Sequence, residues 1–157
     1  QAEKDRAILS DYEVPMNKNC SQREFLAHAA IDSTRRLGVA GIITDSETGE
    51  TVRHLAAFRG PNPILAICYK EKTQRWLNLS FGVIAIHQKE HASPEYIFSA
   101  ALRMLRQKGY ITLNDKIAYL SGSFGENGGT TFLEINEARQ VFDKSYEFHL
   151  PHTSASK

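Results

Sequence analysis

The chain has 157 residues, of which 41% are hydrophobic and 24% charged, and its formal net charge is +1. This composition is typical of a globular domain, and so small a charge gives no electrostatic support for binding nucleic acid or a membrane surface. The two cysteines form no metal or redox motif, and no apolar run approaches the length of a membrane span. We therefore expect one domain with structural thiols in a reducing, cytoplasmic compartment.

The first 20 residues differ from the rest of the chain. Residues 1–9 have the charged and apolar pattern of the end of a helix, and residues 10–19 are polar and contain Pro15, which is typical of a linker. Because the chain starts at Gln1, we expect it to be part of a longer protein, with residues 1–20 ending a preceding domain.

The domain itself is expected over residues 21–137. Ser21 and Glu24 have the spacing of a capping box, which starts a helix, and Gly38 is the residue type that ends one. Alanines on the predicted helix would let it approach a sheet closely. Residues 138–157 form a tail in which some apolar residues should pack and the last six should be disordered.

The stretch that follows Gly38 predicts a strand, a turn, a helix and a second strand. Residues 39–44 are an apolar run, residues 45–49 are polar, and apolar residues then recur at helical spacing from Val52. Residues 64–68 form the next apolar run. This order predicts a parallel βαβ unit buried on both faces, with the turn at the carboxyl end of a strand, where α/β folds place anions.

The later elements complete a sheet of five strands. A loop at residues 70–73 leads to a short helix carrying Trp76, Leu77 and Leu79, and Pro94 starts a longer amphipathic helix. The loop at residues 122–129 is too short for a crossover helix, so the last two strands should be antiparallel. The remaining strands are expected at residues 83–86, 116–121 and 132–135. The fold class is a three-layer α/β/α domain with a mixed, mostly parallel sheet.

Four groups of residues carry a family resemblance by their order and spacing over residues 21–135. They are residues 30–37; Thr44, Gly49, Thr51, Phe58, Arg59, Pro63 and Ile64; Glu71, Lys72, Thr73, Leu77, Leu79, Gly82 and Val83; and Asp115, Ser121, Gly122, Gly129, Thr130 and Thr131. Together they resemble the carboxy-terminal domain of pyruvate kinase.

This resemblance implies several properties of the fold and of the parent protein. It implies the strand order 3-2-1-4-5 with strand five antiparallel, and residues 1–9 as the end of the last helix of a catalytic (β/α)8 barrel. It implies a tetrameric parent kinase whose barrel holds the nucleotide, Mg²⁺ and K⁺, and a carboxy-terminal domain that contributes to subunit contacts and carries an allosteric site. For this chain alone we predict no catalytic residue, no metal ligand and no cofactor.

The predicted effector site lies at the turn and at the end of the glycine-rich loop. Its candidate residues for binding a phosphorylated small molecule are Thr44, Ser46, Thr48, Gly49, Thr51, Gly129 and Thr130. The chain departs from the family pattern in two ways. Two extra residues separate Thr44 from Gly49, and the three acids Asp45, Glu47 and Glu50 surround the turn.

Alternatives to an effector site remain open at this stage. The loop at residues 123–128 has no lysine or arginine, and it contains Glu126, whose charge would repel a phosphate. The turn can be read as a plain strand–helix connection in which Asp45 or Ser46 caps the helix. The sequence is thus compatible with a regulatory domain, with a free-standing domain that binds a small phosphorylated ligand, or with a purely structural assembly domain.

Overall fold

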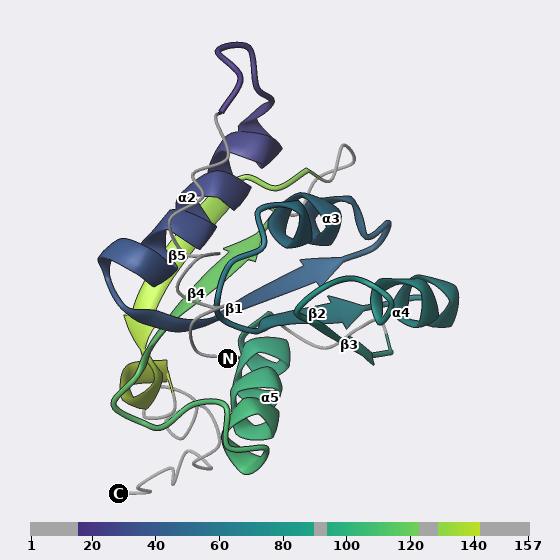
Figure 1. The fold of residues 1–157 in the computed structure, drawn as a ribbon. Helices are drawn as coiled ribbons and strands as arrows, with labels where there is room; N and C mark the ends of the chain where they lie inside the picture. Colours follow the sequence, from purple (N-terminus) through teal and green to yellow (C-terminus); the bar gives the residue numbers. More distant parts are fainter. Residues whose placement is uncertain (1–15, 90–93, 123–128, 142–157) are drawn as a thin grey trace, which may run out of the picture.

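The structure, a computed structural model, describes residues 16–89, 94–122 and 129–141 of the 157. Figure 1 shows a central sheet with helices on both faces. The elements are α2 (Gln22–Arg36), β1 (Val39–Ser46), α3 (Glu50–Ala57), β2 (Ile64–Cys68), α4 (Glu71–Leu77), β3 (Val83–His87), α5 (Pro94–Gln107), β4 (Lys116–Ser121) and β5 (Phe132–Glu137). The helix predicted at residues 1–9 and the disorder predicted at residues 152–157 lie outside the described residues.

The sheet has the predicted topology. Its order is β3-β2-β1-β4-β5. The pairs β1–β2, β1–β4 and β2–β3 are parallel, while β4 and β5 are antiparallel, with Lys116 opposite Glu137 and Ser121 opposite Phe132. The short connection between β4 and β5 dictates that antiparallel pairing, as the sequence predicted.

Two apolar cores lie on opposite faces of the sheet and confirm the three layers. On one face, α2, α3 and α4 cover the sheet through residues such as Ile31, Leu55 and Leu77. On the other face, α5 packs through Phe98 and Leu102. Among the described residues, no helix combines the length and the apolar character that a membrane span requires.

The first strand is longer than the sequence indicated. We expected it to end at Thr44, but Asp45 pairs with Ile67 and Ser46 pairs with Cys68, so β1 continues to Ser46. The apolar run ends where the polar residues begin, whereas the strand ends where backbone pairing with β2 ends. The connection to α3 is therefore only three residues long, from Glu47 to Gly49.

The fourth helix also begins earlier than predicted. The segment expected as a loop forms the first turn of α4, and Leu79 lies beyond the end of this helix at Leu77. Glu71 occupies the first turn, where a carboxylate is favoured by the helix dipole, and its neighbours are good helix formers. The helix propensity of these residues thus allows α4 to start without a side-chain cap.

The predicted ends of α2 are confirmed, as is packing at the start of the tail. The Ser21 hydroxyl accepts a hydrogen bond from the Glu24 backbone amide at 3.2 Å. Gly38 has φ 67°, which favours glycine. At the other end of the domain, Ala138 is buried and Val141 packs against the α5-side core.

The buried thiol of Cys68 makes folding depend on pH. Burial raises its pKa from 9.0 to about 11. Because the folded-state pKa is the higher one, the thiol supports folding fully below its unfolded pKa, and this contribution is lost as the pH rises through the folded pKa. We expect the free energy of unfolding, measured in urea, to fall between about pH 9 and about pH 11. Cys68→Ala should reduce this fall and Cys20→Ala should not; an unchanged fall in Cys68→Ala would contradict the assignment.

Candidate functional site

The site predicted from the sequence lies where the sheet topology reverses direction. From β1 the chain crosses through α3 to β2 on one face, whereas β4 is reached through α5 on the other face. The carboxyl ends of the neighbouring strands β1 and β4 are therefore the switch point, the place where open α/β sheets bind ligands. Ser46 ends β1 and Ser121 ends β4.

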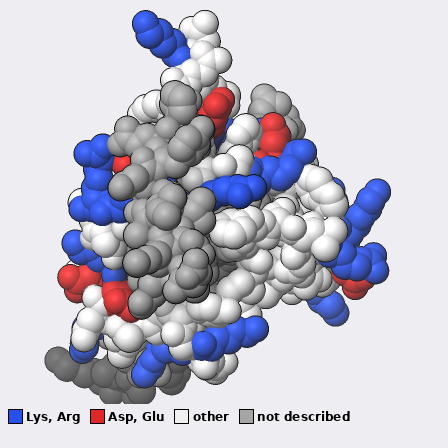
Figure 2. Space-filling model, in the orientation of Figure 1, with Lys and Arg blue, Asp and Glu red and all other residues white. Residues whose placement is uncertain are grey.

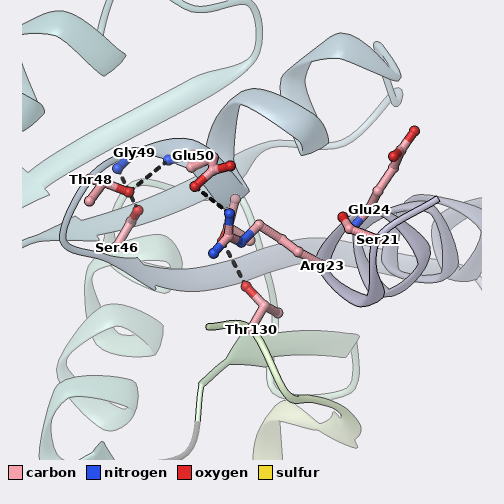
Figure 3. A network of polar contacts seen from close by, with 9 residues as sticks. Ser21, Arg23, Glu24, Ser46, Thr48, Gly49, Glu50 and Thr130 are labelled. Carbon is pink, nitrogen blue, oxygen red and sulfur yellow. Dashed lines mark hydrogen bonds and ion pairs between the residues drawn. The ribbon is translucent and has the colours of Figure 1, made fainter. Parts of the chain in front are cut away.

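The turn between β1 and α3 already uses its own side chains as hydrogen-bond partners. The Gly49 amide donates to the Ser46 hydroxyl at 2.8 Å, and the Glu50 amide donates to the Thr48 hydroxyl at 3.4 Å (Figure 3). Gly49 has φ 82°, and a Cβ there would lie 3.2 Å from a methyl carbon of Leu77. The amides of Gly49 and Glu50, two of those that a bound anion would use at this helix end, are therefore engaged within the chain.

A cation that the sequence analysis missed reaches the turn from α2. Arg23 forms an ion pair with Glu50 at the first position of α3, and Figure 3 shows its side chain extending from α2 to that carboxylate. The side chains of Arg23 and Glu50 are 26% and 45% exposed, so the pair is partly shielded from solvent. Only the packing of α2 against α3 brings these residues together; their separation in sequence gives no signal.

The other end of the predicted site is joined to the turn by a buried contact. The hydroxyls of Thr51 in α3 and Thr130 before β5 lie 2.7 Å apart. Figure 3 labels Thr130. Gly129 lies beside Gly122, where a Cβ would come within 2.3 Å of the Gly129 carbonyl oxygen. The structure thus brings together the two halves of the predicted site, although they are about half the chain apart.

The three acids near the turn occupy different environments. The Asp45 carboxylate accepts hydrogen bonds from the Ser121 hydroxyl at 2.5 Å and the Tyr69 hydroxyl at 3.5 Å. The prediction that Asp45 or Ser46 caps the helix is wrong, because the N-cap of α3 is Gly49 and has no side-chain cap hydrogen bond. Ser46 instead accepts from the Gly49 amide within the turn, while Asp45 points to the opposite face of the strand. Glu47 lies 3.6 Å from the Lys70 amine at an exposed position. Of the three acids, Glu50 is the one in the first turn of α3 itself.

The remaining candidates are supporting residues. Thr44 is buried, and its hydroxyl donates to the Asp45 carbonyl at 3.3 Å. Residues 123–128, including Glu126, lie outside the described part of the chain. Within the described part, no three His, Cys, Asp or Glu side chains come together as a possible metal site.

Comparison with known proteins identifies the family. The family model described as "Pyruvate kinase, alpha/beta domain" matches residues 24–136. The chain belongs to this family. Pyruvate kinase of Borreliella burgdorferi is 31% identical over 118 residues, which are 73% of this chain and 24% of that protein. Pyruvate kinase of Bacillus licheniformis is 30% identical over 119 residues, covering 76% of this chain and 20% of that protein.

Solved structures support the same fold. The structure of Cryptosporidium parvum pyruvate kinase in complex with ADP is similar with a TM-score of 0.72 and 24% identity, over 78% of this chain and 25% of that one. The chain spans only about a quarter of that protein and of the Borreliella enzyme, and a fifth of the Bacillus enzyme. It corresponds to the carboxy-terminal α/β domain of a pyruvate kinase.

The hydroxyl pair of Thr51 and Thr130 should couple α3 to the segment before β5. Replacing either threonine with valine leaves the other hydroxyl buried without this partner, which costs about 1–3 kcal/mol. The double variant should lose less than the sum of the single losses, because the second change removes the unsatisfied group. Urea unfolding of the unmodified chain, the two single variants and the double variant measures these losses. Thr48→Val, at an exposed position, is the control, and additive losses would contradict the coupling.

Proposed function

We propose that this chain is the regulatory and assembly domain of a pyruvate kinase that transfers a phosphoryl group from phosphoenolpyruvate to ADP in glycolysis. The parent's catalytic barrel would hold the nucleotide, Mg²⁺ and K⁺, and the parent would be a cytoplasmic tetramer. The family membership supports this, as does the small share of each relative that the chain spans. Catalysis would then belong to the rest of the polypeptide.

The observation that carries a regulatory role is the polar turn at the switch point. Hydroxyls of Ser46, Thr48 and Thr51 surround the amino end of α3, and Arg23 adds a positive charge. Hydroxyls, backbone amides and a guanidinium are the groups that bind phosphate. In this domain several of them are engaged with one another, so an effector would have to displace existing contacts.

The position of Glu50 argues for weak phosphate binding. Its carboxylate already neutralises Arg23. A phosphate beside it would meet a like charge, which costs on the order of 1 kcal/mol at about 4 Å in water and more in a shielded site. The dipole at the amino end of the helix stabilises an exposed anion by only about 0.3–1 kcal/mol.

The same contacts favour a second candidate, an assembly domain that takes no effector. Ser46 and Thr48 accept from the amides of Gly49 and Glu50, and the Glu50 carboxylate pairs with Arg23, all without any ligand. In that case the Arg23–Glu50 pair and the Thr51–Thr130 pair would serve to join α2, α3 and the β5 edge. A titration of the domain with a phosphorylated sugar separates the two candidates.

For fructose 1,6-bisphosphate we expect a dissociation constant in the millimolar range or weaker, measured by calorimetry at low salt. Glu50→Ser removes the competing carboxylate and frees Arg23, so it should strengthen binding by about tenfold. Glu47→Ser is the matched control, because Glu47 faces Lys70 at an exposed position. A micromolar constant in the unmodified chain that is lost on Thr48→Ala or Thr51→Ala would show that the acids do not oppose the ligand.

A second test addresses the division of labour in the parent. In a coupled assay for ATP formation from phosphoenolpyruvate and ADP, we expect the 157-residue chain to stay at background. The complete parent polypeptide should be active in the same assay. Activity of the chain that survives repurification, or an inactive parent, would refute the proposed function.

A further inference from the structure

The two edge strands of the sheet differ in the charges that they carry. β5 contains Glu134 and Glu137, and charged side chains on an edge strand disfavour pairing with another chain. β3, at the other edge, contains no acid, lysine or arginine. In the view of Figure 2, the surface between α4 and α5, where β3 runs in Figure 1, consists largely of uncharged side chains. The edge at β3 therefore needs another kind of protection.

The outward-facing groups of β3 follow from its hydrogen bonds to β2. The Gly82 carbonyl, just before the strand, accepts from the Ile64 amide at 2.9 Å, and the Gln88 amide, just after the strand, also donates to β2 at 2.9 Å. Because the backbone groups of successive residues in a strand point alternately to its two sides, those of Val83 and Ala85 point away from β2. A further strand would have to pair with these groups.

Two side-chain amides at the end of α4 occupy the outward groups of Ala85. The Ala85 backbone amide donates to the Asn78 side-chain oxygen at 2.9 Å, and the Gln74 side-chain nitrogen donates to the Ala85 carbonyl at 3.4 Å. The next outward amide, that of Val83, donates to the Ser80 carbonyl at 3.3 Å. The bonds that a sixth strand would make with this edge are thus made within the chain.

Helical spacing brings these two side chains to one residue. Gln74 and Asn78 are four residues apart, and the Asn78 backbone amide donates to the Gln74 carbonyl at 3.1 Å, so both lie on one face of α4 and its cap. A carboxamide has both donors and an acceptor, whereas a carboxylate only accepts and an amine only donates. Two carboxamides can therefore meet both the N–H and the C=O of Ala85.

Without these side chains, the edge of β3 would fit the same edge of a second copy. Ile84 and Ile86 are only partly buried against the α5-side core, so apolar surface borders the edge. Two such strands, paired antiparallel about Ala85, would exchange N–H···O=C bonds and bring these isoleucines together. An uncharged, apolar edge strand is the kind that recruits another chain.

We propose that Gln74 and Asn78 close the outer edge of β3 and so prevent the sheet from pairing with the sheet of a second copy. α4 then has two roles, because it covers one face of the sheet through Leu77 and blocks the edge through its two amides. The inference is independent of the proposed function, since it involves no residue of the predicted effector site.

Sedimentation of the 157-residue chain and of its Gln74→Ala/Asn78→Ala variant at matched concentrations tests the proposal. We expect the double variant to associate about tenfold more strongly than the unmodified chain, because the backbone groups of Ala85 can then bond to a second copy. Gln107→Ala, which removes an exposed amide at the end of α5, is the matched control and should leave association unchanged.

Hydrogen exchange of the Ala85 amide, followed by NMR, locates the association. In the double variant this exchange should slow as the protein concentration rises, whereas in the unmodified chain it should be slow at every concentration, because Asn78 accepts from the amide. A folded double variant that associates no more than the unmodified chain would overturn the proposal. So would association that leaves Ala85 exchange fast at every concentration.

A milder variant keeps the test decisive if the double variant does not fold. Asn78→Ala changes one exposed residue and leaves Gln74 in place. It should strengthen association by about threefold, because it frees the Ala85 amide alone. Association equal to that of the unmodified chain would overturn the proposal in this variant as well.

Discussion

The burial of β1 between two parallel neighbours is the constraint on which the rest of this domain depends. β1 pairs with β2 on one side and with β4 on the other. Its residues contribute to both cores, with Val39 and Ile42 on the α2 side and Ile43 on the α5 side. A slip of one residue would move the side chains of each core into the other core and disrupt the packing of both, so the position of the carboxyl end of β1 is fixed.

The fixed end of β1 determines where the polar groups of the site can lie. Alternation along the strand directs Asp45 to Ser121 and Tyr69, and directs Ser46 to the amide of Gly49. The short connection then starts α3 directly beside α2, where Arg23 meets Glu50. The location that suits an anion is consequently filled by the protein's own acceptors and by one carboxylate.

Much of the fold could be predicted because its signals are local. Continuous apolar runs gave the strands, Ser21 and Pro94 gave helix starts, and the short loop before β5 gave the antiparallel pair. The end of β1 was misplaced because backbone pairing, and not side-chain polarity, extends it through Ser46.

The site was predictable only in part, because its contacts join distant segments. The turn could be located from the polar residues after β1, but the partners of its acids could not. Arg23 reaches Glu50 only after α2 packs on α3, and Ser121 reaches Asp45 only after β4 pairs with β1. The sequence therefore predicted three acids around the turn, whereas the structure separates their roles.

The central claim is that the amides of Gly49 and Glu50 at the start of α3 already have acceptors within the chain. The most direct measurement is a titration with inorganic phosphate, monitored through the backbone amide resonances of Gly49, Glu50 and Thr51 in the isotopically labelled chain. The account predicts no saturable shift of these resonances through the millimolar range in the unmodified chain, and a saturable shift in Glu50→Ser. Saturation of the Gly49 and Glu50 shifts at micromolar phosphate in the unmodified chain would contradict it.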